Sequence, residues 1–140
     1  MSAASRMNSL NTCSRTICGA SLALLCLFAR AEIYIISHPG LHITADQIKD
    51  IYTGEKQFAG TIRLTPIDNG ISQNAFLAAA LGLDVMKYNA IWIRRSFREG
   101  QSPPQVKPGD AAVISYVRRA PGAVGYVTTQ PSGVNIVYKF

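Results

Sequence analysis

The hydrophobic and polar positions divide the chain into an apolar N-terminal segment and a series of short alternating runs. Residues 32–37 are β-branched and aromatic and are followed by Pro-Gly at 39–40, which predicts a strand buried on both faces. Thr44 then begins a helix, because a Thr N-cap followed three residues later by Gln47 is a capping box. Gly54 is expected to end that helix.

The remainder of the chain continues the alternation of strand and helix. A second strand is predicted over residues 61–67, ending at Pro66, with a turn at 68–70 after it. Helices are expected over 73–81, 84–97 and 110–119, a loop over 100–108, and closing strands over 123–128 and 134–138. This alternation predicts a single compact α/β domain, in which a short mixed sheet is flanked by helices.

The first 31 residues are predicted to be a secretory signal peptide. Basic residues precede an uncharged apolar stretch over 16–29, and Ala29 and Ala31 supply the small residues that a signal peptidase requires. The apolar run is shorter than the roughly 20 residues that span a bilayer, so an uncleaved membrane anchor is the less favoured alternative. Cleavage after Ala31 would leave 32–140 as one periplasmic or secreted domain without a stable membrane span.

Composition changes this picture once the signal segment is set aside. All three cysteines precede residue 32, so the exported domain is expected to fold without disulfides. Three of the 14 basic residues and none of the 8 acidic ones also precede it, and the net charge of +6 falls to +3. Such a charge does not favour a nucleic-acid partner. No thiol, nucleophile elbow or phosphate-cradling loop indicates an enzyme, and we expect no catalytic residues and no cofactor.

Five short motifs follow one another behind the predicted signal. They are Ile48–Gly54, Ile62–Pro66, Phe76 with Leu81-Gly82, Trp92 with Phe97–Gly100, and Pro121–Val127. In this order they resemble the motifs of the phosphate-type periplasmic substrate-binding proteins of ABC transporters. Complete members of that family clamp the ligand between two lobes, and the resemblance implies that this chain is a single lobe of a type II periplasmic binding protein.

The resemblance implies a small oxyanion such as phosphate as the ligand. Phosphate-binding members carry an Arg and a Ser-Gly-Thr at the start of the helix after the second strand. Here Asp68 lies near the place of the Arg, where it would repel an anion, and Ser72, Gln73 and Asn74 replace Ser-Gly-Thr. These three residues are the candidate ligand site, because the first turn of a helix presents free N–H groups and a positive dipole end. The alternative is that Ser72 only caps its own helix.

Three basic residues form a candidate docking surface. At 100° per residue, Lys87, Arg94 and Arg98 lie at about 200°, 180° and 220° around the helix over 84–97. The same helix is expected to bury Val85, Tyr88 and Trp92 on its other side. A basic stripe of this kind is often only a solvated face, and its functional interpretation is docking on an acidic partner or an anionic membrane. The alternative function is therefore a ligand-less structural or signalling partner of another envelope protein.

Two histidines lie close together in the sequence without predicting a metal site. His38 and His42 are four residues apart and Asp46 follows four residues later. The Pro-Gly pair at 39–40 prevents the histidines from sharing a helix face, and no cysteine or third histidine completes a ligand set. We therefore expect a surface loop and no bound metal.

Overall fold

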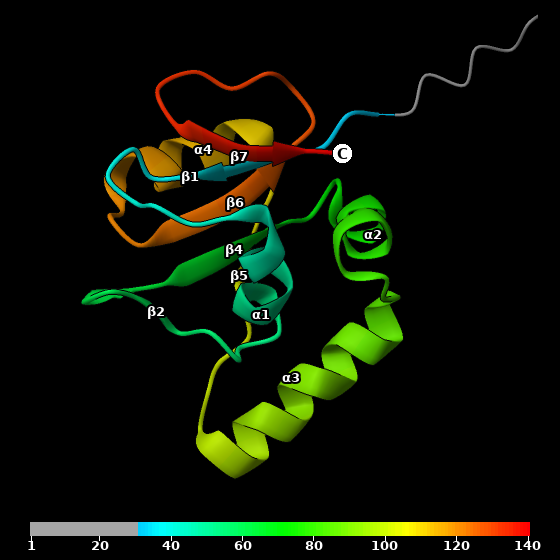
Figure 1. The fold of residues 1–140 in the computed structure, drawn as a ribbon. Helices are drawn as coiled ribbons and strands as arrows, with labels where there is room; N and C mark the ends of the chain where they lie inside the picture. The colour runs from blue at the N-terminus through cyan, green and yellow to red at the C-terminus, as the bar shows by residue number, and fades with distance from the viewer. Residues whose placement is uncertain (1–30) are drawn as a thin grey trace, which may run out of the picture.

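The computed structural model describes residues 31–140, so the predicted signal peptide up to residue 30 lies outside the described residues. A five-stranded mixed sheet has helices on both faces and is accompanied by a two-stranded hairpin (Figure 1). The strands are β1 (Tyr34–Ser37), β2 (Phe58–Ala59), β3 (Ile62–Arg63), β4 (Thr65–Asn69), β5 (Gln105–Lys107), β6 (Ala123–Val127) and β7 (Asn135–Lys139). The helices are α1 (Ile48–Tyr52), α2 (Gln73–Phe76), α3 (Val85–Glu99) and α4 (Asp110–Arg119), with a 3₁₀ turn over Ala45–Gln47 and a π-helical turn over Leu77–Leu81. The predicted α/β class is confirmed.

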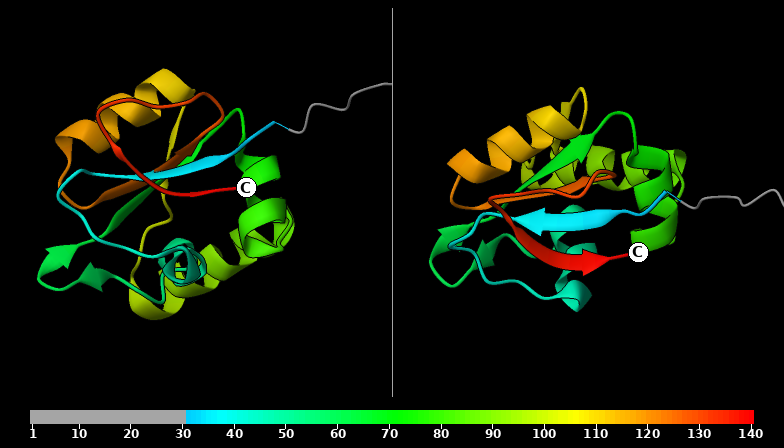
Figure 2. Two further views of the ribbon diagram at one scale, coloured as in Figure 1. Left: turned by 45° about the horizontal axis from the view of Figure 1, so that its top comes forward. Right: turned by 90° about the horizontal axis from the view of Figure 1, so that it is seen from above.

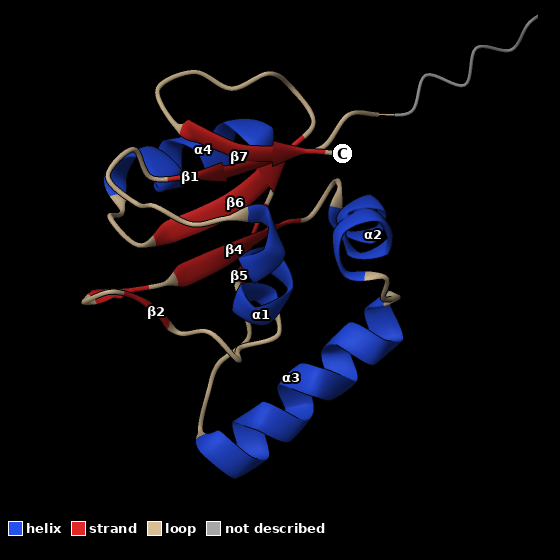
Figure 3. Ribbon diagram, viewed as in Figure 1, coloured by secondary structure: helices blue, strands red, loops and turns tan. Residues whose placement is uncertain are grey.

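The order of strands in the sheet is β5-β4-β6-β1-β7 (Figure 3). β4 pairs parallel with β5 and with β6, whereas β1 pairs antiparallel with β6 and β7. Because β4 and β6 run in the same direction, their carboxyl ends lie at the same edge of the sheet. The chain leaves β4 at that edge and enters α2 directly, which places the candidate ligand site there.

Two hydrophobic clusters hold the layers together, one on each face of the sheet. Figure 2 shows α4 on one face and α1 on the other. The cluster on the α1 face also takes in α2 and α3, and its aromatic centre includes Phe76 and Tyr126, whose rings stack at 3.8 Å. The α4 face buries Val113 and Val117 against the sheet. Every fully buried member of both clusters lies between Ile33 and Val127, so both clusters lie within residues 32–140, and we expect these residues to fold by themselves.

The expectation of one strand over 61–67 and a turn from residue 68 is wrong. The chain forms two separate strands, β3 and β4, and β4 continues through Asp68 and Asn69. Asp and Asn favour turns because their side chains bond their own backbone. Here the Asp68 carboxylate bonds residues of α2, α3 and β6, and the Asn69 Nδ2 bonds Asp110, so the strand continues through two buried residues. The Oδ1 of Asn69 still accepts the N–H of Ile71, so the turn is formed after residue 69 and not at residue 68. The predicted loop over 100–108 likewise contains strand β5, which pairs with β4.

The predicted orientation of the third helix is confirmed. α3 buries Tyr88 and Trp92 and leaves Lys87, Arg94 and Arg98 exposed. Val85, which was also expected to be buried, is only half-buried at the edge of the core. Its N-cap is Asp84, whose carboxylate accepts a hydrogen bond from the backbone N–H of Lys87 at 2.8 Å. The indole of Trp92 reaches the end of α1, where its Nε1 donates to the carbonyl of Tyr52 at 3.1 Å.

No single helix within residues 31–140 is long and apolar enough to cross a bilayer. One bent pair, Gln73–Leu81 with Val85–Glu99, meets the requirement only when the two helices are taken together across an 82° bend. Several apolar side chains of that pair, among them Phe76 and Leu77, are buried in the core.

Candidate anion-binding site at the start of α2

The three residues of the candidate ligand site lie at the junction of β4 and α2. Ser72 is 5% exposed, Gln73 is half-buried and Asn74 is exposed. The first intrahelical bond runs from the N–H of Phe76 to the carbonyl of Ser72 at 2.9 Å. The N–H groups of Gln73, Asn74 and Ala75 precede that bond and, as in any first helical turn, have no partner within the helix.

The hydroxyl of Ser72 does not cap the helix. Its Oγ is buried and has no hydrogen-bond partner among residues 31–140, and the N-cap position has φ −113° and ψ 10°. The turn before the helix is instead held by Asn69, which accepts the N–H of Ile71 through Oδ1 at 3.1 Å and the N–H of Ser72 through its carbonyl at 3.2 Å. The alternative that Ser72 only caps α2 is therefore wrong, and a buried hydroxyl is left without a partner, which is costly unless a ligand or water binds it.

Asp68 belongs to the core and not to a surface turn. Its side chain is 1% exposed and accepts hydrogen bonds from the hydroxyls of Tyr88 and Tyr126, both at 3.0 Å, and from Nε2 of Gln73 at 3.2 Å. Burial raises the pKa of the Asp68 carboxyl above its ordinary value, and the hydrogen bonds from Tyr126, Tyr88 and Gln73 oppose that rise. The Gln73 side chain is thus committed to Asp68, so Gln73 can offer a ligand only its backbone N–H.

The same burial acts on the two tyrosines that bind Asp68. Burial, followed by the nearby Asp68 carboxylate, raises the pKa of both Tyr88 and Tyr126 far above that of an ordinary phenol. Both hydroxyls therefore stay protonated and serve as donors at any physiological pH. The Asp68 cluster ties α2, α3 and β6 together beneath the start of α2.

A second polar cluster fixes the edge of the sheet beside the site. Asn69 Nδ2 donates to Asp110 at 2.6 Å and to the carbonyl of Tyr126 at 3.2 Å. The other oxygen of Asp110 accepts from the backbone N–H and hydroxyl of Thr128 and of Thr129, at 2.9 to 3.0 Å. This cluster was not predicted from the sequence, although an Asp at the first position of a predicted helix is a signal for such a contact.

The Asp110 cluster predicts a pH-dependent contribution to stability. Burial raises the pKa of Asp110, but the hydrogen bonds from Thr128, Asn69 and Thr129 outweigh it and hold the pKa below its ordinary value. A depressed folded-state pKa adds stability above the unfolded pKa, near 3.9, and loses it as the pH falls through the folded value. Asp110→Asn should cost about 1–2 kcal/mol at pH 7, since bonds to a charged acceptor are lost.

Thermal melts from pH 7 to pH 2.5 measure this difference. The gap between wild type and Asp110→Asn should shrink as the pH falls below about 4. Asp46→Asn, which changes an exposed carboxyl on the 3₁₀ turn, should melt like the wild type throughout. A gap between Asp110→Asn and wild type that stays constant with pH would contradict the role assigned to the Asp110 carboxylate.

Two of the three docking residues border a groove between α1 and α3. Arg94 and Arg98 line it from α3, and Lys49 of α1 and Thr53, the C-cap of α1, line it from the other side. Lys87 lies on the same side of α3 but does not line the groove. None of the three predicted docking cations forms an ion pair within the described chain.

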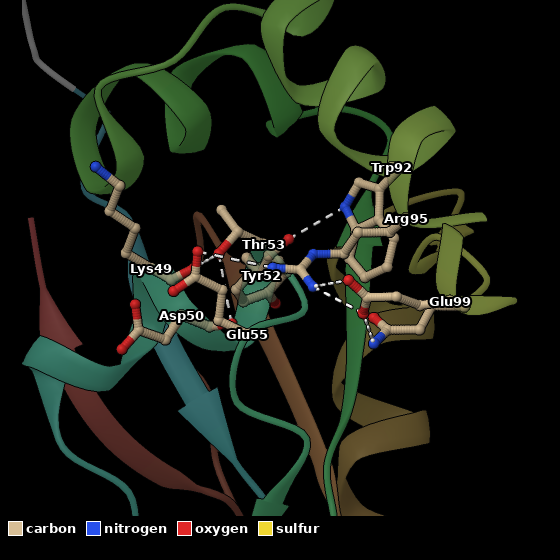
Figure 4. A network of polar contacts seen from close by, with 9 residues as sticks. Lys49, Asp50, Tyr52, Thr53, Glu55, Trp92, Arg95 and Glu99 are labelled. Carbon is tan, nitrogen blue, oxygen red and sulfur yellow. Dashed lines mark hydrogen bonds and ion pairs between the residues drawn. The ribbon is translucent and has the colours of Figure 1, made fainter. Parts of the chain in front are cut away.

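Arg95 is a further basic residue that the sequence analysis missed. Figure 4 shows its guanidinium between α1 and α3, where Nη1 binds Glu99 at 3.0 Å and Nη2 lies 3.7 Å from Glu55. Trp92 lies beside it, and a Cβ on Gly54, whose φ is +78°, would come within 3.0 Å of both side chains. Arg95 therefore fastens α3 to the end of α1 and is not available to an anionic partner.

The two histidines lie on the surface near the end of β1. His42 is exposed, and His38 is half-buried, with its Nδ1 accepting the N–H of Gly40 at 3.1 Å. Within residues 31–140 no three His, Cys, Asp or Glu side chains come together as a metal would require.

Comparison with known proteins shows a likeness to a solved structure. No protein-family model and no curated protein sequence matches the chain. A phosphate ABC transporter substrate-binding protein from Clostridium perfringens, solved with bound phosphate, superimposes with a TM-score of 0.58 at 21% sequence identity. The match covers 76% of this chain but only 45% of that protein. At this identity the likeness concerns the fold: the chain has the α/β fold of less than half of a periplasmic substrate-binding protein.

Proposed function

We propose that this protein is an exported, non-catalytic binding module whose ligand is a small oxyanion such as phosphate, held at the start of α2. The observation that carries the proposal is the buried Ser72 hydroxyl, which has no partner among the described residues. Ser72 is the residue directly before the first helical turn, whose N–H groups have no partner within the helix. Residues 1–31 would be the signal peptide, and the domain over 32–140 would act in the periplasm or outside the cell.

Uncharged donors are sufficient to hold an oxyanion at this position. The N–H groups of Gln73 and Asn74 and the hydroxyl of Ser72 can donate to different oxygens, and the positive end of the dipole of the helix over 73–81 favours negative charge. The exposed amide of Asn74 offers one more donor. Asp68 does not occupy the anion position, because three donors hold its carboxylate in the core.

The affinity of the domain for an oxyanion depends on how much of a complete binding protein it represents. That protein is known with bound phosphate, and this chain corresponds to 45% of it. A ligand that is clamped from one side keeps part of its hydration, and we expect a dissociation constant of roughly 0.1–1 mM for the domain alone. A second lobe supplied by another chain would tighten it.

Isothermal titration calorimetry of residues 32–140 with phosphate and with sulfate tests the site. Losing a hydrogen bond to a charged group costs about 1.5–3 kcal/mol, so Ser72→Ala should weaken binding roughly tenfold or more. Ser115→Ala, which removes an exposed hydroxyl from α4, is the matched control and should bind like the wild type. The proposal fails if neither anion produces heat, or if Ser72→Ala binds as tightly as the control.

A ligand-less docking protein is the second candidate function. It is favoured by the exposed cations Lys87, Arg94 and Arg98, which have no ion-pair partner within residues 31–140. In this alternative the domain keeps the fold, binds no anion and attaches to another envelope protein through α3. The calorimetry separates the two candidates, because the docking protein would give no heat with either anion.

A further inference from the structure

The exposed side of α3 carries a ridge of large apolar side chains. Phe97 is 89% exposed, Met86 is 83% exposed and Ile93 is 59% exposed. They are spaced seven and four residues apart, so they fall on one side of the helix and form a line about 16 Å long. We call Met86, Ile93 and Phe97 the apolar ridge. Exposed apolar side chains that are grouped in this way mark an interaction surface, whereas scattered ones do not.

The apolar ridge lies next to the basic stripe of Lys87, Arg94 and Arg98. Measured from Val85 at 100° per residue, the ridge covers about 80–120°, the stripe about 180–220° and the buried side about 300–340°. α3 therefore presents three separate sides, one packed on the core, one apolar and one cationic. The two acidic residues at its ends are both engaged, Asp84 as the N-cap and Glu99 with Arg95.

The helix that carries these two surfaces is held firmly. Trp92 binds the carbonyl of Tyr52, and Arg95 bridges Glu55 and Glu99 (Figure 4). These contacts lie on the side of α3 that faces α1, away from the ridge. α3 forms an outer edge of the molecule, well separated from α4 and β7 (Figure 1), so an extended surface can approach it.

A second copy of this chain is a poor partner for the ridge. In a two-fold antiparallel pair of α3 helices, Met86 of each copy would face Phe97 of the other. In such a pair the basic stripes of the two helices, each made of Lys87, Arg94 and Arg98, lie on the same side of the interface and next to each other. Six cations would then line one side of the interface, and their repulsion opposes the dimer. The positive charge of the basic stripe favours an anionic partner.

We propose that α3 binds an anionic lipid membrane, with the apolar ridge inserted among the acyl chains and the basic stripe on the lipid phosphates. An in-plane amphipathic helix has this arrangement of large apolar side chains beside Lys and Arg. The side chains of Met86 and Phe97 project from a convex helix, and a deformable bilayer accepts them without a preformed groove. This surface does not use the start of α2, so the membrane proposal does not depend on the anion site.

Co-sedimentation of residues 32–140 with vesicles tests the proposal. The protein should bind vesicles of equal parts phosphatidylglycerol and phosphatidylcholine, bind phosphatidylcholine alone at least tenfold more weakly, and be released by about 0.5 M salt. The ridge variant Ile93→Ser with Phe97→Ser should lose binding roughly tenfold or more. Arg94→Gln with Arg98→Gln should lose it to a similar extent.

Two control variants separate this surface from others. Ile136→Ser with Tyr138→Ser changes exposed apolar residues of β7 and should bind vesicles like the wild type, as should Ser115→Ala on the exposed side of α4. Circular dichroism melts establish that every variant is folded. The proposal is overturned if the wild type does not bind phosphatidylglycerol vesicles, which is the result expected of a docking surface for an acidic protein. It is also overturned if the ridge variant binds vesicles as well as the β7 variant does.

Discussion

Trp92→Ala should remove a large part of the stability of this domain. The indole is 6% exposed, belongs to the cluster on the α1 face and donates a hydrogen bond to the carbonyl of Tyr52. Truncation removes the ring from the core and leaves that carbonyl without its partner. Replacing a buried aromatic by alanine costs about 3–5 kcal/mol, and a domain of this size has a total stability of about 5–15 kcal/mol. Thermal or urea unfolding measures the loss.

Variants on the other sides of α3 are the controls for Trp92. Arg94→Ala with Arg98→Ala changes only exposed side chains and should stay within about 0.5 kcal/mol of the wild type. Trp92→Phe keeps part of the packing but loses the hydrogen bond, and it should fall between the wild type and Trp92→Ala. A Trp92→Ala domain as stable as the wild type would contradict the burial of this face.

Asp68→Arg should also unfold the domain. From the family resemblance alone, this change would restore the Arg of the phosphate clamp. In the structure Asp68 is buried beneath Tyr88 and Tyr126. An Arg there would bury an unpaired cation and leave two tyrosine hydroxyls without acceptors, for which we expect a loss of at least about 3–5 kcal/mol. Unfolding in urea, together with phosphate titration of any folded fraction, measures the result.

Asp68→Asn is the conservative control for that prediction. Its carbamoyl oxygen can still accept from one or two of the three donors, so a loss of about 1–3 kcal/mol is expected and the domain should remain folded. An Asp68→Arg domain that is folded and binds phosphate more tightly than the wild type would mean that residue 68 faces the ligand and not the core.

Local sequence signals located the helices of this domain, although α3 continues two residues beyond the predicted end at Phe97, and the helix predicted over 73–81 becomes π-helical after Phe76. The helix over 110–119 is confirmed at both ends, and Asp84 and Gly100 flank α3 as N-cap and left-handed C-cap, the latter with φ 65°. The placement of Trp92 inside and Arg94 outside follows from the 3.6-residue period. Each of these features depends on residues within a few positions of one another, so the linear sequence contains the information.

The features that shape the candidate site depend on residues far apart in the chain. By itself the sequence determined that Ser72 begins a helix and that Lys87, Arg94 and Arg98 share one side of another. It predicted a turn at Asp68 and Asn69, because both residues favour turns in water. Only the tertiary structure supplied Tyr126, 58 residues beyond Asp68, and Asp110, 41 residues beyond Asn69, as partners.

Those distant partners decide the chemistry at the start of α2. The hydroxyl of Tyr126 helps to draw Asp68 into the core, and Asp110 holds Asn69 in the strand. Asn69 in turn stabilises the turn before α2, because its Oδ1 accepts the N–H of Ile71. The Ser72 hydroxyl is buried and has no partner among the described residues. The local sequence gives the propensity of a residue for turn, strand or helix. The hydrogen-bond partners that override this propensity are brought together only when the sheet and helices pack.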